Sequence, residues 1–557
     1  MRHKMDLTRR SLLARMGVAA GVCASSSFAA LAMHGGAGGM KKIAPNWVSP
    51  NFNPDVDMEL TCCPSEASIL EGRATGVWRY AANLLKGPEN TLTPLPDSYL
   101  GPVMRFQKGQ KIRIRLRNGL PEPTIAHWHG LHVPMLMDGH PMYAIDPGET
   151  FVYEFEIRNR AGLYFYHPHT HEATATQVYR GMAGAIIVND DEEKALELPS
   201  GEFEIPIVLQ DRSFNDANQL VYSGGMHAQM VGFQGDHVLV NGRPDYAIDV
   251  ASRAYRLRIL NGSNSRIYKL AWDDASPITV IGVDGGLLEK PEAKPYVMLA
   301  PGERLDVWAD FSGRSVGSRI VMRSAPFSGV LPRMARGMMG GMMAETALPV
   351  GGDYPLFTVR VARASGESPV LPQRLTRIDR LRPEDVANPR DPVPIAISEA
   401  PMAMLLNGRP YADNDALPRE RIPVDTLQLV EIFHDGGMGM GRGMGMGRGM
   451  GMMGRGMGMM GGGMGMMGGM MSMAHPIHLH GQQFQILSRS ADDADPRDYA
   501  TMSEGFISSG WKDTVLVTPG ERVRIIKPFG DFKGAFMYHC HNLEHEDMGM
   551  MRQFIVE

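Results

Sequence analysis

A Pro-Gly-Glu turn occurs three times in this 557-residue chain, and each copy leads into a segment in which apolar and polar residues alternate. The turns begin at Pro147, Pro301 and Pro519, and the segments after them span 151–157, 304–311 and 522–528. Alternation with a period of two is typical of half-buried β-strands, and proline and glycine favour tight turns between strands. The pattern therefore predicts an all-β fold.

A second repeat indicates that the chain contains related units. The sequence Leu-Val-Asn-Gly-Arg-Pro at 239–244 returns as Leu-Leu-Asn-Gly-Arg-Pro at 405–410. Together with short strands and little helical periodicity, the repeats predict three Greek-key β-sandwich domains. Their expected boundaries are 45–192, 200–362 and 395–557, with a Pro-, Arg- and Asp-rich linker at 363–394.

The first residues have the pattern of an export signal. Thr8-Arg9-Arg10-Ser11-Leu12-Leu13 is a twin-arginine motif, and Ala30-Leu31-Ala32 fits a cleavage site after a weakly apolar stretch. A membrane anchor is disfavoured because that stretch is short and contains three serines. We expect residues 1–32 to be a signal peptide and the mature chain to be periplasmic, without a membrane segment.

Methionine and glycine dominate one segment. Residues 436–473 hold 16 Met, 18 Gly, 3 Arg and 1 Ser. Core-filling methionines appear at helical or strand spacing, whereas a half-glycine tract is expected to be a mobile loop. Because a thioether is a soft metal ligand, the loop is interpreted as a metal-capture segment. A smaller group has the same interpretation: Met334, Met338, Met339, Met342 and Met343.

Histidine has the most informative distribution. Ten of the 18 histidines fall in four motifs: His127-Trp128-His129, His167-Pro168-His169, His475-Pro476-Ile477-His478-Leu479-His480, and His539-Cys540-His541 with His545. In a strand, side chains two residues apart share one face. His539 and His541 should therefore face one metal group while Cys540 faces another.

The donor types favour copper. Cys540, His475, His545 and the thioether of Met550 form the two-His, one-Cys, weak-Met set of a blue-copper centre. The eight other motif histidines suffice for three further coppers. Structural zinc would require more cysteines, and non-haem iron usually takes carboxylate ligands, which these motifs lack.

Other classes are excluded or left open by composition. The balance of 56 basic and 61 acidic residues does not favour a nucleic-acid partner. Four cysteines cannot form a disulfide framework in a chain of this length. The adjacent Cys62 and Cys63 could form a vicinal disulfide, remain free thiols or contact a peripheral copper.

With these motifs, the chain resembles the three-domain, laccase-like multicopper oxidases over nearly its whole mature length. The continuation Glu546-Asp547-Met548-Gly549-Met550-Met551 and the segment Trp511-Lys512-Asp513-Thr514-Val515 are similar to the bacterial periplasmic cuprous oxidases. The resemblance implies cupredoxin-like domains and four coppers. It assigns type 1 copper to His475, Cys540, His545 and Met550, type 2 copper to His127 and His478, and the two type 3 coppers to His129, His167 and His541 and to His169, His480 and His539.

The resemblance also implies an arrangement of domains and two catalytic acids. The three-copper site should lie between the first and third domains, and the second should carry no catalytic copper. Asp138 and Glu546 match the family's proton-relay positions, which fits the four protons that reduction of O2 to water requires.

One departure concerns the substrate site. In the resembled enzymes an acidic residue and a methionine lie four and two positions before the first type 1 histidine. Here those positions hold Met471 and Met473, so the thioether is kept and the carboxylate is lost. Met471 and Met473 are the candidate substrate residues.

The expected function is a monomeric copper-dependent oxidase that transfers single electrons from Cu(I) to O2, forming water and protecting against copper. Two alternatives stay open at this point. One is a laccase-type oxidase of phenols or aromatic amines, with a small organic reductant as its partner. The other is a periplasmic copper-sequestering protein in which turnover is incidental.

Overall fold

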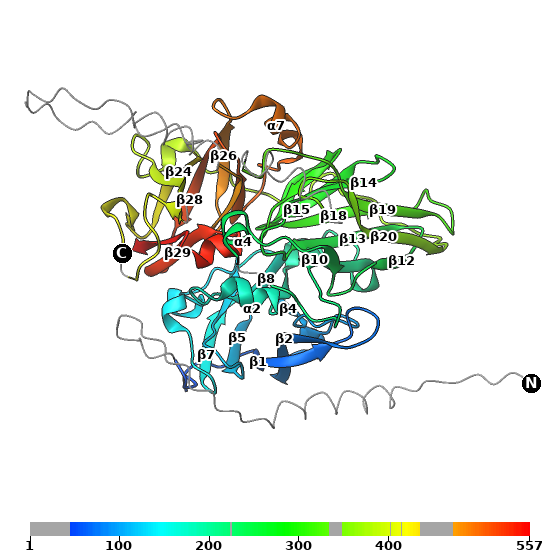
Figure 1. Ribbon diagram of the computed structural model, residues 1–557, viewed down its shortest axis with the longest axis horizontal. Helices are drawn as coiled ribbons and strands as arrows, with labels where there is room; N and C mark the ends of the chain where they lie inside the picture. Colours follow the sequence, from blue (N-terminus) through cyan, green and yellow to red (C-terminus); the bar gives the residue numbers. More distant parts are fainter. Residues whose placement is uncertain (1–44, 223–224, 333–347, 401–402, 414, 435–471) are drawn as a thin grey trace, which may run out of the picture. The chain divides into compact units, whose positions relative to one another are not determined.

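A computed structural model describes residues 45–557 except 223–224, 333–347, 401–402, 414 and 435–471. The expected signal peptide, the smaller methionine group, Met471 and nearly all of the Met/Gly segment lie outside the described residues. Within the described ranges, no helix has the length and apolar character needed to cross a membrane. The fold is all-β, with short helices at strand ends (Figure 1).

The first two sheets use residues 56 to 189. One has the order β2 (Thr75–Lys86), β1 (Val56–Ala67), β5 (Lys111–Asn118), β7 (Thr150–Glu156). The other has the order β3 (Leu92–Thr93), β4 (Val103–Gln107), β9 (Gly184–Asn189), β8 (Gly162–Pro168), β6 (Ala126–His129). One buried apolar cluster draws on both sheets, so they form a sandwich.

The next two sheets use residues 204 to 363. One runs β11 (His237–Val240), β10 (Glu204–Arg212), β13 (Ala254–Asn261), β18 (Arg304–Asp310), β15 (Ile278–Val283), β16 (Gly286–Lys294). The other runs β12 (Ala247–Ala251), β20 (Tyr354–Arg363), β19 (Arg319–Ser324), β14 (Tyr268–Trp272), β17 (Val297–Leu299). They also enclose one shared core.

The last two sheets use residues 393 to 556. One runs β22 (Ala403–Leu406), β21 (Val393–Ala400), β24 (Thr426–His434), β28 (Arg522–Phe529), β26 (Gln485–Ser490). The other runs β23 (Arg421–Ile422), β30 (Met551–Val556), β29 (Gly534–Cys540), β25 (His475–Leu479), β27 (Thr514–Val517). A third core fills this sandwich. The boundaries set from sequence remain a proposed division of the chain.

The repeated Pro-Gly-Glu turns share one construction. In each, the glycine has a positive φ, at 86° for Gly148, 82° for Gly302 and 77° for Gly520. The glutamate carboxylate then accepts the backbone N–H three residues earlier, at 2.8 to 2.9 Å. Because the turn needs both a glycine conformation and an acceptor at a fixed offset, the same three residues recur before β7, β18 and β28.

The helices are short. In the described ranges the α-helices are α2 (Thr174–Tyr179), α3 (Asp191–Lys194), α4 (Met226–Val231), α7 (Pro496–Ala500) and α8 (Leu543–Asp547). Helices α2 and α4 both pack on α8, which follows the Cys540 motif. Helix α8 is therefore covered by α2, which lies between strands of the first sandwich, and by α4, which belongs to the second.

Candidate copper centres

Four strands carry the histidine motifs, in pairs. His127 on β6 lies opposite His167 on β8, and His478 on β25 lies opposite His539 on β29. All ten motif histidines are buried, with at most 3% of the residue exposed. The structure therefore brings the motifs of the first and third sandwiches together.

Eight of these histidines form what we call the trinuclear group. Within it, ring nitrogens converge in three sets, each within 4.8 Å: His127, His129 and His478; His129, His167 and His541; His169, His480 and His539. The last two sets are the type 3 sets implied by the resemblance, and the first contains the type 2 pair. The ligand assignment itself remains a proposal.

The pKa values of six of these rings are lowered from the ordinary value, so these rings are neutral at pH 7: His129, His167, His169, His478, His480 and His541. Burial is the largest cause that lowers their pKa values, and adjoining imidazoles add to it at His129, His167, His169, His480 and His541. The pKa of His478 falls to about 3, again mainly through burial. Neutral imidazoles offer the lone pair that a metal needs.

At His127, His167 and His478, one ring nitrogen is held by a backbone carbonyl while the other lacks a partner. His127 Nδ1 lies 2.6 Å from the carbonyl of Asp138, His167 Nδ1 lies 2.8 Å from that of Pro168, and His478 Nδ1 lies 2.9 Å from that of Asp513. Among the described residues, the opposite nitrogen Nε2 of each ring is buried without a hydrogen-bond partner. Buried polar atoms are rarely left unpaired, so a cation at these nitrogens fits the site.

The type 1 group consists of His475, Cys540, His545 and Met550. Cys540 Sγ lies 3.4 Å from His475 Nδ1 and 3.7 Å from His545 Nδ1, and these two nitrogens are 3.3 Å apart. The fully buried Met550 is held nearby, because its carbonyl accepts the N–H of Cys540 at 3.0 Å. Burial raises the pKa of the Cys540 thiol, so a bound metal is needed to make it a thiolate.

Asp138 and Glu546 both lie against the trinuclear group. Asp138 Oδ2 is 2.7 Å from His480 Nδ1, and Glu546 Oε2 is 3.1 Å from His539 Nδ1. Burial is the main cause that raises the pKa of Asp138. Both carboxylates therefore contact rings of the trinuclear group.

Sequence reasoning missed a carboxylate at the type 1 group. Glu399, near the end of β21, places Oε1 2.9 Å from His475 Nε2, 3.1 Å from His434 Nε2 and 2.8 Å from the N–H of Met473. Position 471 holds methionine as described above, and it is Glu399, 76 positions before His475, that places a carboxylate at the type 1 group. No local motif links Glu399 to His475, because β21 and β25 belong to different sheets of the third sandwich and meet only in the folded structure.

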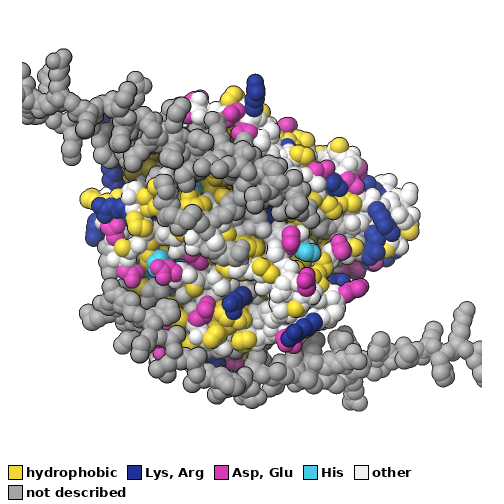
Figure 2. Space-filling model, in the orientation of Figure 1, with side chains coloured by type: hydrophobic (Ala, Val, Ile, Leu, Met, Phe, Trp, Pro, Cys, Tyr) yellow, Lys and Arg dark blue, Asp and Glu magenta, His cyan; other side chains and the backbone are white. Residues whose placement is uncertain are grey.

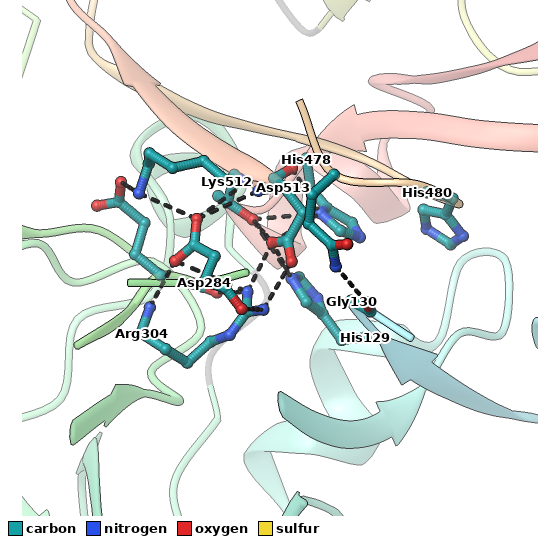
Figure 3. Close-up of polar contacts among 12 residues, drawn as sticks. His129, Gly130, Asp284, Arg304, His478, His480, Lys512 and Asp513 are labelled. Atoms are coloured by element: carbon teal, nitrogen blue, oxygen red, sulfur yellow. Dashed lines mark hydrogen bonds and ion pairs between the residues drawn. The ribbon is translucent and has the colours of Figure 1, made fainter. Parts of the chain in front are cut away.

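The described residues of the second sandwich supply no member of the three histidine sets above, yet they contact both groups. The carbonyl of Met230, on α4, lies 3.3 Å from His545 Nε2. Arg304, on β18, donates to both oxygens of Asp513, whose Oδ1 lies 3.1 Å from His129 Nε2 (Figure 3). Burial raises the pKa of Asp513, but Arg304 and His129 together hold it well below its ordinary value.

The state of the adjacent cysteines was left open by the sequence. Cys62 and Cys63 are both buried on β1, and no disulfide joins them. On the face shown in Figure 2, acidic and basic side chains are interspersed. That distribution agrees with the balanced charge of the sequence.

Comparisons with known proteins give one consistent family. Two family models, both described as multicopper oxidase, match residues 77–193 and 465–557. The multicopper oxidase mco of Staphylococcus aureus is 28% identical over 82% of this chain and 82% of its own length.

Solved structures agree in fold. The McoA multicopper oxidase of Aquifex aeolicus is 30% identical, with a TM-score of 0.70 over 93% of this chain and 98% of that one. The laccase-like multicopper oxidase CueO of Ochrobactrum sp. is 26% identical, with a TM-score of 0.68 over 90% and 97% of the two chains. The similarity therefore spans all three sandwiches.

Proposed function

Since this chain belongs to the multicopper oxidase family, whose members are copper-dependent oxidoreductases that use O2, we propose that its reducing substrate is Cu(I). When bound, the four coppers accept electrons one at a time and deliver four of them to O2, which becomes water. Each Cu(I) ion loses one electron and becomes Cu(II). The expected benefit to the cell is copper tolerance.

The observation that carries this proposal is the Glu399 carboxylate. It contacts His475 through Nε2, on the side of the ring opposite the nitrogen that faces Cys540. The His434 imidazole and the Met473 backbone share the same carboxylate oxygen. A carboxylate, an imidazole and a neighbouring methionine are donors that suit a copper cation arriving at His475.

Charge also favours a cation here. Burial alone would raise the pKa of Glu399, but His434 and His475 hold it well below its ordinary value. The carboxylate therefore remains anionic in a site where the field of a charge is weakly screened. A cationic reductant is attracted to such a position, whereas a neutral phenol gains little from it.

The other type 1 histidine is covered. Both type 1 rings are fully buried, but Met230, on α4 of the second sandwich, caps His545 Nε2 through its carbonyl, whereas His475 Nε2 faces the Glu399 carboxylate. A bulky aromatic substrate would have to displace α4 to reach that ring. This favours entry of electrons on the His475 side.

Asp138 and Glu546 are proposed to supply protons to the trinuclear group. Each has a carboxylate oxygen within 3.1 Å of a ligand histidine, and both are buried. A carboxylic acid in such a position can donate a proton where oxygen is reduced. The remaining protons would reach the site by reloading these two groups.

A laccase-type oxidase remains the second candidate, because the similar CueO of Ochrobactrum sp. is described as laccase-like. The variant Glu399→Gln separates the two. It keeps a hydrogen-bond acceptor for His475, and we expect four coppers and the blue colour to persist. Cu(I) oxidation should fall at least about tenfold, while oxidation of a small phenol should change little.

Glu431→Gln is the matched control, because Glu431 on β24 pairs with Arg522 and Arg524 away from the type 1 group. It should leave both activities unchanged. Equal losses of Cu(I) and phenol oxidation in Glu399→Gln would mean that Glu399 only orients His475, and the laccase-type function would then be preferred. If the protein bound Cu(I) without consuming O2, copper sequestration would be the preferred function.

Export to the periplasm is proposed from the twin-arginine motif. Replacing Arg9 and Arg10 with lysine should leave the protein in the cytoplasm and remove copper tolerance in a growth assay. Detection of the double variant in the periplasm would contradict export by the twin-arginine route.

A further inference from the structure

Asp513 lies at the point where the three sandwiches meet the trinuclear group. Its Oδ1 accepts hydrogen bonds from Arg304 Nη1 at 2.6 Å and from Thr514 Oγ1 at 2.9 Å, and it lies 3.1 Å from His129 Nε2. Its Oδ2 accepts from Arg304 Nη2 at 2.6 Å (Figure 3). Asp513, Arg304 and His129 are all fully buried.

These contacts determine the tautomer of His129. A carboxylate paired with a guanidinium can only accept hydrogen bonds, so His129 Nε2 carries the ring proton. The other nitrogen, Nδ1, is buried and has no hydrogen-bond partner among the described residues. The lone pair of Nδ1 is therefore the one available to a metal.

Asp513 orients a second ring through its backbone. Its carbonyl lies 2.9 Å from His478 Nδ1, which leaves His478 Nε2 for a metal. The rings of His129 and His478 are stacked, with centroids 3.7 Å apart. One residue thus fixes two adjacent rings of the trinuclear group.

Arg304 is in turn held rigidly, because all five of its N–H donors are used. Nε donates to the carbonyl of Leu163 in the first sandwich at 3.0 Å. Nη1 and Nη2 also donate to the carbonyls of Gly302 and Asp284, both at 2.9 Å. A planar guanidinium can donate two parallel hydrogen bonds to one carboxylate, whereas the ammonium group of a lysine cannot.

The surrounding charges reinforce this position. Lys512 lies 3.0 Å from Asp284 and 3.1 Å from Glu303, so the neighbouring acids of the second sandwich are neutralised separately. Asp284 Oδ2 also accepts the backbone N–H groups of Asp513 and Thr514, both at 3.3 Å. Arg304 therefore forms its close ion pair with Asp513: its Nη1 lies 2.6 Å from Asp513 Oδ1 but 3.9 Å from Asp284 Oδ1.

We propose that Arg304 is a positioning residue of the trinuclear copper centre. By a two-bonded contact it fixes the Asp513 carboxylate, and this carboxylate holds His129 with Nδ1 directed to the metal. The second sandwich, whose described residues are in none of the three histidine sets, would thus govern how firmly the other two sandwiches retain copper. The competing interpretation is that Arg304 only joins the sandwiches.

The test is retention of copper in Arg304→Lys, measured on the copper-loaded protein during dialysis against a chelator. Lysine keeps the positive charge but cannot form the two parallel hydrogen bonds to Asp513. We expect the blue type 1 absorption to persist, because the type 1 group lies elsewhere, while the three other coppers are lost at a chelator concentration roughly 10- to 100-fold lower. Copper per chain and the blue absorption give two readouts that do not depend on turnover.

Arg266→Lys is the matched control. Arg266 is also fully buried in the second sandwich and pairs with an aspartate, Asp211, at 2.8 Å, but its recorded partners do not include a histidine. It should weaken the fold without selective loss of copper. Equal chelator sensitivity in the two variants, or parallel loss of blue colour and of the other coppers in Arg304→Lys, would overturn the proposal.

A second variant covers the case in which Arg304→Lys does not fold. Arg304→Gln combined with Asp513→Asn removes both charges and leaves no unpaired buried ion. Selective loss of the three coppers with retained blue colour is again the expected result. Retention of all four coppers at the wild-type chelator concentration would overturn the proposal.

Discussion

In these centres, the hydrogen-bond partner of one ring nitrogen sets the tautomer and the orientation of a histidine. Asp138 illustrates this, since its carbonyl holds His127 and its carboxylate holds His480. Glu399 does the same for His475 in the type 1 group. Each partner selects one tautomer and turns the other nitrogen inward, so the orienting residues contribute to metal affinity as directly as the ligands do.

Glu546→Gln tests the proton role at the residue scale. The amide preserves shape but removes the transferable proton, so copper content and blue colour should persist while O2 reduction slows by about 100-fold. The control is Glu544→Gln, because Glu544 contacts Tyr222 and Asn264 rather than a ligand ring. An oxygen-electrode assay showing equal rates in both variants would make Glu546 a structural acid.

Lys527 gives a prediction about pH. It is 1% exposed, and burial lowers its pKa to about 7, although Asp513 and Asp138 favour its charged form. Because the folded-state pKa lies below the unfolded value of about 10.4, the charged lysine destabilises the fold fully below pH 7 and not at all above about pH 10.5. Lys527→Met should therefore raise the free energy of unfolding by on the order of 3 kcal/mol at pH 6, and by little at pH 11.

Urea unfolding at the two pH values measures this difference. The exposed Lys533→Met is the control, and it should shift the free energy of unfolding by no more than about 0.5 kcal/mol at either pH. A gain that is independent of pH in Lys527→Met would attribute the effect to packing instead.

At the scale of elements, the three Pro-Gly-Glu turns are built alike but have different neighbours. A Cβ added to Gly302 would lie 2.9 Å from the ring of His541, whereas one added to Gly148 would meet nothing within 4 Å. The turn before β18 therefore serves the trinuclear group, and the turn before β7 serves only its own sandwich.

Gly302→Ala and Gly148→Ala form a matched pair. Both require a non-glycine residue at positive φ, so each should lose about 1 kcal/mol of stability. Gly302→Ala alone should also displace His541 and lower the copper content after dialysis, read by metal analysis. Similar copper contents in two folded variants would show that the ring of His541 adjusts without cost.

Deletion of 437–470 tests the Met/Gly segment. The described strands on either side, β24 and β25, end and begin outside the deletion, so the fold and four coppers should persist. If clustered thioethers concentrate Cu(I) near His475, its oxidation should fall, while oxidation of a bulky phenol should rise as the approach opens. Loss of both activities in proportion to copper content would make the segment structural, and unchanged Cu(I) oxidation would refute metal capture.

At the scale of the whole molecule, copper joins sandwiches that are distant in sequence. The trinuclear group combines strands β6 and β8 with β25 and β29, so bound copper stabilises their association and not the unfolded chain. Removing copper should lower the calorimetric unfolding midpoint by at least several degrees. Reloading should restore it, and an unchanged midpoint would mean that apolar contacts alone hold the sandwiches together.

Much of this architecture could be predicted from local sequence. The Pro-Gly-Glu turns fix strands, and His539-Cys540-His541 places two donor types on opposite faces because strand side chains alternate. Glu399, His434 and Arg304 could not be found in this way. Their roles depend on which strands become neighbours, and a lone glutamate, histidine or arginine in an ordinary strand has no local signature.

The cap on His545 has a consequence for electrochemistry. With α4 over that ring, we expect electrons to enter the type 1 group on the Glu399 side, and Ser398, the residue before Glu399, is exposed. All cysteines among the described residues are buried, so Ser398→Cys would give one accessible anchor for a gold surface. Molecules tethered there would present their electron inlet to the conductor, and current per immobilised molecule would then depend on orientation more than on coverage.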